Sequence, residues 1–217
     1  METNAVNYEI ENNIGIIKGS NPPVNALSYE VRKGLINCLA ILLEKKDVKG
    51  IILIGEGRTF FAGADISEFG KPMKSPSLNE VITEFENSKK PIVAALHGTP
   101  LGGGLELAMG CNYRVALKNT MLGLPEVKLG IIPGAGGTQR LPRIVGVEKA
   151  LNMITSSSPI NSVEALNCRL LDEIYDNELL ENSKKFLLNI INSKKHPIVK
   201  HININENTLS SNFFKDY

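Results

Sequence analysis

The stretch that decides the fold is Pro91-Ile-Val-Ala-Ala-Leu-His-Gly-Thr-Pro-Leu-Gly-Gly-Gly-Leu-Glu-Leu-Ala-Met-Gly-Cys111. It begins with a continuous apolar run, Pro91–Leu96, which is typical of a strand covered on both faces. A loop then ends in the triplet Gly102-Gly-Gly104, and an almost wholly apolar helix follows that contains Glu106. The stretch therefore predicts one strand–loop–helix unit.

The same unit recurs on both sides of this stretch. Short apolar runs at Gly50–Ile54 and Tyr113–Leu117 predict two further buried strands. The other predicted elements are a hairpin (Tyr8–Glu11 and Ile14–Lys18), a helix of about eighteen residues capped by Ser28, an extended piece near Met121–Leu124, and helices at Asn79–Ser88, 146–155, 162–168 and 179–192. These elements predict an α/β protein with a largely parallel sheet and a helical C-terminal part. Patterning alone suggests a simple doubly wound sheet.

Composition restricts the class of protein. The chain has 217 residues, of which 42% are hydrophobic and 22% charged, with a formal net charge of +1. The near-neutral charge argues against a nucleic-acid or membrane-surface partner. No apolar run reaches the length of about 18 residues that a membrane helix needs. The three cysteines, Cys38, Cys111 and Cys168, are widely spaced, which favours a reducing compartment, with the cytoplasm as the default.

Two isolated carboxylates lie near two glycine clusters. Glu106 lies in an apolar helix, where a charge is costly unless it is paired or can take a proton. Glu106 is either satisfied by the N-terminus of its helix or has a raised pKa that suits proton exchange. Glu126 after Pro125 would be ordinary alone, but the two carboxylates together suggest acid–base chemistry on a carbonyl-activated substrate.

The glycine clusters do not fit the common phosphate-binding motifs. Gly102–Gly104 and Gly134–Gly137 lack the spacing of a dinucleotide fingerprint, and the Gly-Lys-Ser/Thr ending of a P-loop is absent from the triplet. A glycine triplet at a helix start either lets the helix pack closely on the sheet or leaves free N–H groups for an oxygen that gains negative charge. Glu106 in the same turn favours the second interpretation.

Other catalytic mechanisms lack the necessary residues. The sequence has no G-x-S-x-G motif, and its three histidines form no H-E-x-x-H motif, so neither a serine hydrolase nor a zinc site is predicted. We interpret His97 as a residue that tethers its loop and Asp65 as a helix cap. Lys71 and Lys74, in a loop expected to be mobile, could contact phosphates.

The sequence resembles the crotonase superfamily, which comprises enoyl-CoA hydratases and enoyl-CoA isomerases. The resemblance covers roughly Asn21 to Asp172, and its opening segment is most like the N-terminal hydratase part of multifunctional β-oxidation enzymes. The motifs that carry it are Asn21-Pro-Pro-Val-Asn-Ala-Leu27, Phe61-Ala-Gly-Ala-Asp-Ile66, Pro91-Ile-Val-Ala-Ala-Leu-His-Gly98, Leu101-Gly-Gly-Gly-Leu-Glu-Leu-Ala108, Pro125-Glu126 and Gly130-Ile-Ile-Pro-Gly-Ala-Gly-Gly-Thr-Gln-Arg-Leu-Pro142.

The resemblance implies a fold and a reaction. The fold is a spiral of ββα units, and the oxyanion hole consists of the backbone N–H groups of Ala64 and Gly103. Glu106 and Glu126 match the two acid–base residues that hold one water and add it across the 2,3 double bond. The substrate-binding residues implied for coenzyme A and its acyl group are Ala62, Gly63, Asp65, Ile66, Gly102, Gly104, Pro125 and Gly134, with Ala62–Ile66 on the adenine side.

The resemblance also implies an organisation and partners. Residues 1–195 form the crotonase-like domain, and 196–217 form a polar tail or the start of a linker. The partner is an acyl-CoA thioester, with no cofactor beyond the coenzyme A of the substrate. The expected assembly is a homotrimer or hexamer, or fusion to or association with a 3-hydroxyacyl-CoA dehydrogenase. The chain stops at Tyr217, earlier than stand-alone hydratases, which leads us to expect a fragment of a fused enzyme or a variant that needs a partner. Possession of both carboxylates favours a hydratase, with Δ3-Δ2 isomerisation as a candidate second activity. The alternatives are a pure isomerase, another CoA-thioester enolate enzyme and an inactive CoA-binding module.

Overall fold

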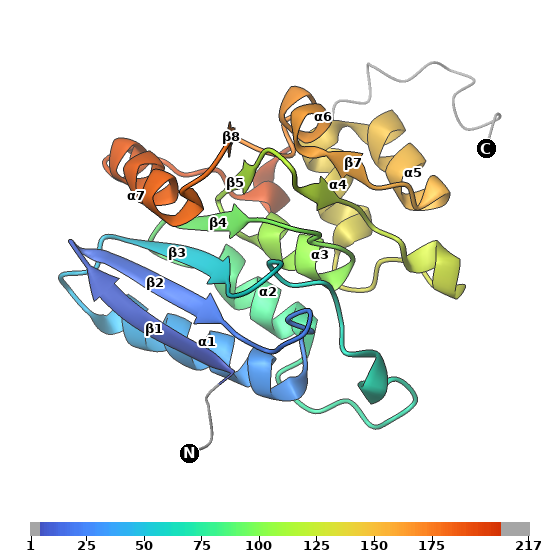
Figure 1. Cartoon of the computed structure of the whole chain (residues 1–217), viewed down its shortest axis with the longest axis horizontal. Helices are drawn as coiled ribbons and strands as arrows, with labels where there is room; N and C mark the ends of the chain where they lie inside the picture. The colour runs from blue at the N-terminus through green and yellow to red at the C-terminus, as the bar shows by residue number, and fades with distance from the viewer. Residues whose placement is uncertain (1–4, 205–217) are drawn as a thin grey trace.

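The structure, a computed structural model, describes residues 5–204. Its main sheet has the strand order β1-β2-β3-β4-β5-β8, and Figure 1 shows β1 to β5 side by side in chain order. The strands are β1 (Val6–Glu11), β2 (Ile14–Gly19), β3 (Gly50–Gly55), β4 (Ile92–Leu96), β5 (Tyr113–Leu117) and β8 (Glu173–Tyr175). The β1–β2 pair is antiparallel and every other pair is parallel.

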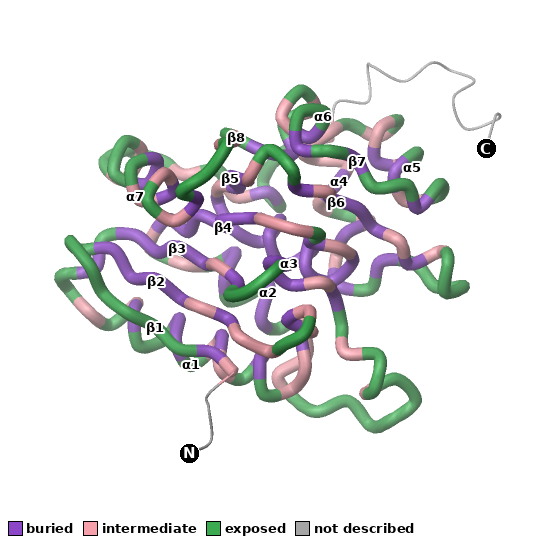
Figure 2. The backbone as a smooth tube through the Cα atoms, viewed as in Figure 1, coloured by how far each residue is buried: buried purple, intermediate pink, exposed green. Residues whose placement is uncertain are grey.

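Both faces of the sheet are covered, as the continuous apolar runs predict. Alternate residues of β3, Ile51 and Leu53, belong to one core cluster, and Ile52 between them belongs to another. The first cluster contains the buried faces of α1 (Tyr29–Glu44), α2 (Leu78–Glu86) and α3 (Gly103–Gly110). The second contains residues of α7 (Leu179–Ile190), which covers the opposite face. In Figure 2, β2 to β5 are mostly buried and β1 is mostly exposed.

The winding of the chain differs from a doubly wound sheet. The helices that connect β2 to β3, β3 to β4 and β4 to β5 all pack into the same core cluster. The strand order therefore never reverses, and the chain advances along the sheet as a spiral. The α/β class with a largely parallel sheet is confirmed.

The C-terminal part is largely helical. Its elements are η2 (Glu126–Leu129), α4 (Gly137–Val145), α5 (Val147–Ser156), α6 (Ser162–Asn167), α7 and η3 (Val199–His201). The extended piece near residue 121 is β6 (Met121–Leu122), which pairs with β7 (Ile160–Asn161) in a second, two-stranded sheet. No helix among residues 5–204 is long and apolar enough to cross a membrane.

The stretch between residues 196 and 204 packs on the body of the protein. Val199 is buried, and the side chain of Asn112 donates a hydrogen bond to the carbonyl of Pro197. Residues 205–217 lie outside the described residues, so the domain boundary at 195 stays a prediction.

Candidate active site

Glu106 is buried in the first turn of α3, and a neighbouring helix binds its carboxylate. Its Oε1 atom accepts hydrogen bonds from the N–H groups of Ala135 at 2.8 Å and Gly137 at 2.7 Å. Gly137 is the first residue of α4, so the carboxylate lies at the positive end of that helix. Burial raises the pKa of Glu106, whereas the two N–H donors and the guanidinium of Arg140 oppose that shift. Both hydrogen bonds go to Oε1, so Oε2 is not bound by either of these two donors.

The close approach of this loop requires glycine. A Cβ atom on Gly137 would lie 2.9 Å from Oε1 of Glu106, and Gly136 has a φ of +91°, in the left-handed region. The second glycine cluster therefore holds Glu106, a link that sequence analysis did not make.

Glu126 is also buried but has a different environment. It begins η2, directly after Pro125, and its Oε2 atom has no hydrogen-bond partner among the described residues. Burial raises the pKa of Glu126 to about 7, a backbone N–H opposes the shift, and the charge of Glu106 adds to it. A Cβ on Gly102 would lie 3.0 Å from Oε1 of Glu126. The carboxyl group therefore lies against the start of α3, close to Glu106.

Two backbone N–H groups lie near each other beside this pair. Ala64 forms a parallel bridge with Leu27, and Gly63 accepts a hydrogen bond from the N–H of Leu27. A Cβ on Gly103 would lie 3.4 Å from the nitrogen of Ala64. Within residues 5–204, neither the N–H of Ala64 nor that of Gly103 donates a hydrogen bond to a protein oxygen. The two groups are thus available to one external acceptor.

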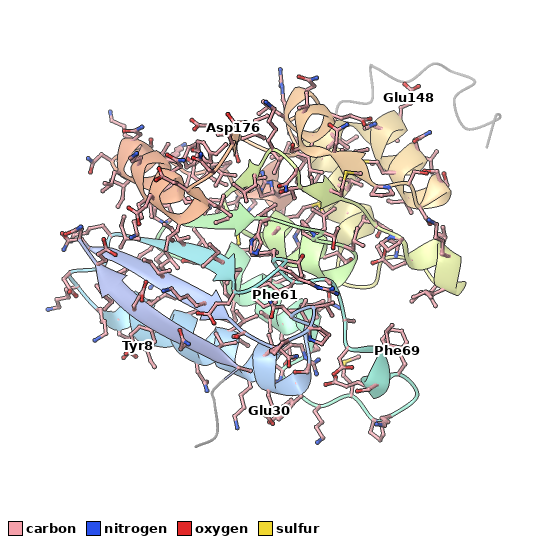
Figure 3. All side chains as sticks on the ribbon, in the orientation of Figure 1. Tyr8, Glu30, Phe61, Phe69, Glu148 and Asp176 are labelled. Carbon is pink, nitrogen blue, oxygen red and sulfur yellow. The ribbon has the colours of Figure 1, made fainter. Side chains whose placement is uncertain are left out.

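A very close contact fixes Phe61 to Ala64 against α3. A Cβ on Gly104 would lie only 1.8 Å from the carbonyl oxygen of Phe61, so only glycine permits this approach. The Phe61 side chain is fully buried near the middle of the molecule, whereas Phe69 lies on a projecting segment (Figure 3).

Some residues singled out from the sequence lie beside the pair, and others do not. The side chain of Asp65 accepts a hydrogen bond from Ser67 N as the cap of η1 (Ile66–Glu68). Ile66 is 69% exposed, and Ala62 donates its N–H to the carbonyl of Val24. Gly134 belongs to the loop that holds Glu106, and its carbonyl accepts a hydrogen bond from Asn79.

A cavity of about 550 Å³ opens beside Ala64. Its lining includes Asp65, Lys71 and Lys74, with Lys74 Nζ 5.5 Å from the centre of the Tyr29 ring. Ala64 therefore lines the same cavity as the two lysines that the sequence suggested for phosphate contact.

His97 tethers its loop as predicted, whereas Arg32 has partners that the sequence did not indicate. His97 ties its loop to the preceding turn, with Nε2 3.1 Å from the carbonyl oxygen of Gly57. Arg32 of α1 is buried, where it pairs with Glu68 at 2.9 Å and donates to the carbonyl of Pro76. A lone arginine in an amphipathic pattern gives no signal of such partners.

Comparison with known proteins identifies related chains. The model of the enoyl-CoA hydratase/isomerase family matches residues 9–211. The peroxisomal bifunctional enzyme of Danio rerio is 41% identical over 185 residues, which are 85% of this chain and 26% of that protein. A probable enoyl-CoA hydratase of Bacillus subtilis (strain 168) is 46% identical over 175 residues, which are 77% of this chain and 68% of that one. The chain thus spans about a quarter of the length of the bifunctional relatives.

Solved structures show the same architecture. An enoyl-CoA hydratase from Thermoplasma volcanium GSS1 matches with a TM-score of 0.81 and 30% identity, covering 88% of this chain and 78% of that one. An enoyl-CoA hydratase from Bacillus anthracis matches with a TM-score of 0.79 and 32% identity, covering 86% and 76%. These matches confirm the spiral fold that the sequence resemblance implied.

Proposed function

Because the chain belongs to the enoyl-CoA hydratase/isomerase family, we propose that it adds water across the 2,3 double bond of trans-2-enoyl-CoA thioesters in β-oxidation. The observation that carries this proposal is the contrast between two neighbouring carboxyl groups. Glu106 accepts two N–H hydrogen bonds, which favour its ionised form, whereas Glu126 has a buried oxygen without a partner and a pKa raised to about 7. An ionised base and a protonated acid side by side are what hydration requires.

In the proposed reaction, the backbone and the two carboxyl groups have separate roles. The thioester oxygen accepts hydrogen bonds from the N–H groups of Ala64 and Gly103, which stabilise the negative charge that develops there. Glu106 takes a proton from water, and the resulting hydroxide bonds to C3 of the enoyl group. Protonated Glu126 then gives its proton to C2, which yields the 3-hydroxyacyl-CoA. Transfer of one proton from Glu106 to Glu126 through solvent restores the starting state.

We assign the cavity beside Ala64 to the nucleotide end of coenzyme A. Segment 62–66 would line the adenine side, and Lys71 and Lys74 would meet the phosphates. The support is that Ala64, whose N–H group is proposed to bind the thioester, lines the same cavity as both lysines. The proposed reaction needs no cofactor beyond the coenzyme A of its substrate.

The test of this function is the hydration of crotonyl-CoA, followed by the loss of the enoyl-thioester absorbance. Glu106→Gln and Glu126→Gln should each lower kcat at least about 100-fold, because each removes a proton-transfer group. Glu84→Gln, which changes an exposed carboxylate on α2, is the matched control and should keep the wild-type rate. Near-wild-type rates in both site variants would contradict the proposal.

The pair of carboxyl groups also fits proton transfer between C2 and C4, so we include Δ3-Δ2-enoyl-CoA isomerisation as a second activity. Incubation with 3-enoyl-CoA, with product analysis, tests it separately.

We further propose that the chain works either as a homotrimer or hexamer or in association with a 3-hydroxyacyl-CoA dehydrogenase, since several relatives are named as bifunctional or multifunctional proteins. Some of those names also specify the peroxisome, whereas we propose the cytoplasm for this chain.

A further inference from the structure

A buried ion pair lies next to the proposed site and has no role in the reaction described above. Arg140 of α4 binds Glu86 at the end of α2 with two parallel hydrogen bonds, Nε to Oε1 at 3.1 Å and Nη2 to Oε2 at 3.0 Å. The side chains are only 13% and 5% exposed. A two-point pair of this kind fixes the orientation of the guanidinium as well as its position.

The remaining end of Arg140 reaches the loop that holds Glu106. Its Nη1 donates to the carbonyl oxygen of Ala135 at 3.1 Å, and the N–H of Ala135 donates to Glu106 at 2.8 Å. A Cβ on Gly136 would lie 2.1 Å from that Nη1, so the guanidinium occupies the space that a side chain would need. Hydrogen bonds therefore run without interruption from Glu86 through Arg140 and the Ala135 segment to the carboxylate of Glu106.

We propose that Arg140, oriented by Glu86, is a positioning residue that fixes the loop donors of Glu106 and helps to keep that carboxylate ionised. The inference rests on the proposed hydration and deepens it. Arg140 acts through its hydrogen bond to Ala135 and through its positive charge, and it does not contact the substrate.

Few other charges face Glu106. Glu126 approaches from η2 and is the other reacting group. From α2, Glu86 stands behind Arg140. From β5, Arg114 binds the carbonyl of Cys111, just beyond the C-terminal end of α3 and away from the loop. Arg114 is even more buried than Arg140 and also pairs with a carboxylate, Asp172, so it serves as a control.

The test compares a variant that removes a positive charge near Glu106 with a variant that removes a negative charge. Arg140→Met removes a positive charge near Glu106 and should raise its pKa by about half a unit or more. Glu86→Gln keeps one acceptor oxygen for the guanidinium but removes the negative charge that opposes Arg140, so the pKa of Glu106 should fall. Arg114→Met should leave that pKa unchanged. If Arg140 and Glu86 only supported the fold, their substitution would not shift the pKa in opposite directions.

The pKa of Glu106 is read by carbon NMR of full-length protein labelled at the glutamate carboxyl carbons, with its signal assigned by its loss in Glu106→Gln. In parallel, Arg140→Met should lower kcat for crotonyl-CoA at least about tenfold, with KM within about threefold, and move the acidic limb of the kcat/KM profile upward. The proposal would be overturned if the pKa of Glu106 shifted in the same direction in Arg140→Met and Glu86→Gln, or did not shift in either variant.

Two further experimental outcomes also have a defined meaning for the proposal. If Arg140→Met does not fold, Glu86→Gln decides alone, since the proposal requires a downward shift of the Glu106 pKa. If the wild-type protein does not hydrate crotonyl-CoA, the proposed function fails, while the NMR titration still decides whether Arg140 positions and ionises Glu106.

Discussion

Two glutamates of the proposed site differ only in their surroundings. Glu106 receives two backbone hydrogen bonds on one oxygen, whereas Glu126 buries an oxygen that has no partner among the described residues. Burial raises the pKa of both carboxyl groups, but only Glu106 is compensated by donors from a neighbouring helix. In the proposed reaction, the environment, and not the residue type, distinguishes the base from the acid.

The raised pKa of Glu126 makes stability depend on pH. Its folded-state pKa of about 7 exceeds the ordinary value of 4.5, so folding favours the protonated form. This contribution is fully present below pH 4.5 and is lost as the pH rises through about 7. The glutamine in Glu126→Gln cannot ionise, so the variant does not lose this contribution. The Tm of the variant minus the Tm of wild type should therefore be at least about 2 °C larger at pH 8 than at pH 4.5. Calorimetry at both pH values measures this, and a Tm difference independent of pH would contradict it.

At the residue scale, the sequence draws attention to the two glutamates of the proposed site but not to their hydrogen-bond partners. Glu106 is conspicuous because it interrupts an apolar run, and Glu126 is noticed because it follows proline beside a second glycine cluster. Ala135 and Gly137 are about thirty positions away from Glu106, and they reach it only because α4 packs on α3. A single sequence holds no signal for that packing, and the same is true of the Arg140–Glu86 pair.

At the scale of elements, the contact between segment 61–64 and α3 brings the two free N–H groups together. Gly104→Ala should lower the free energy of unfolding by at least about 3 kcal/mol, because its Cβ would overlap the rigid carbonyl of Phe61 at 1.8 Å. Gly134→Ala is the control, since its Cβ would meet no atom closer than 4.0 Å. Urea denaturation compares them, and equal stability of the Gly104 variant and wild type would refute this role.

Long, strongly patterned elements were predicted well, and short polar ones were missed. Strands β1 to β5 and the helices α1, α2, α3, α5, α6 and α7 follow apolar runs or helical periodicity, which the sequence displays directly. Strand β8 has only three residues, and η1 also has three and no buried side chain. These elements depend on the neighbours they pair with, so their own sequence carries little information.

On the scale of the whole molecule, the proposed site draws on segments 61–64, 102–106, 126 and 134–137, which only the folded chain brings together. A ligand that binds across them should therefore stabilise the folded state. Crotonyl-CoA at about 100 times its Kd should stabilise Glu126→Gln by about 2.7 kcal/mol, a rise in Tm of roughly 5 °C or more. Crotonic acid, which lacks coenzyme A, should give no shift at the same concentration. Equal shifts for both ligands would argue against a thioester site here.

The direction of winding also belongs to the whole molecule. Patterning distinguished an α/β protein but could not tell a doubly wound sheet from a spiral, because both alternate strands and helices along the chain. The distinction depends on which face each connecting helix covers, and the resemblance of several motifs together supplied it.

The central claim is that two acidic side chains and two backbone N–H groups converge on one enoyl thioester. The most direct measurement is a crystal structure of Glu126→Gln with bound crotonyl-CoA. We expect the thioester oxygen about 3 Å from the nitrogens of both Ala64 and Gly103, with Glu106 and residue 126 facing the double bond. A thioester oxygen bound away from these nitrogens, or a double bond out of reach of both side chains, would contradict the claim.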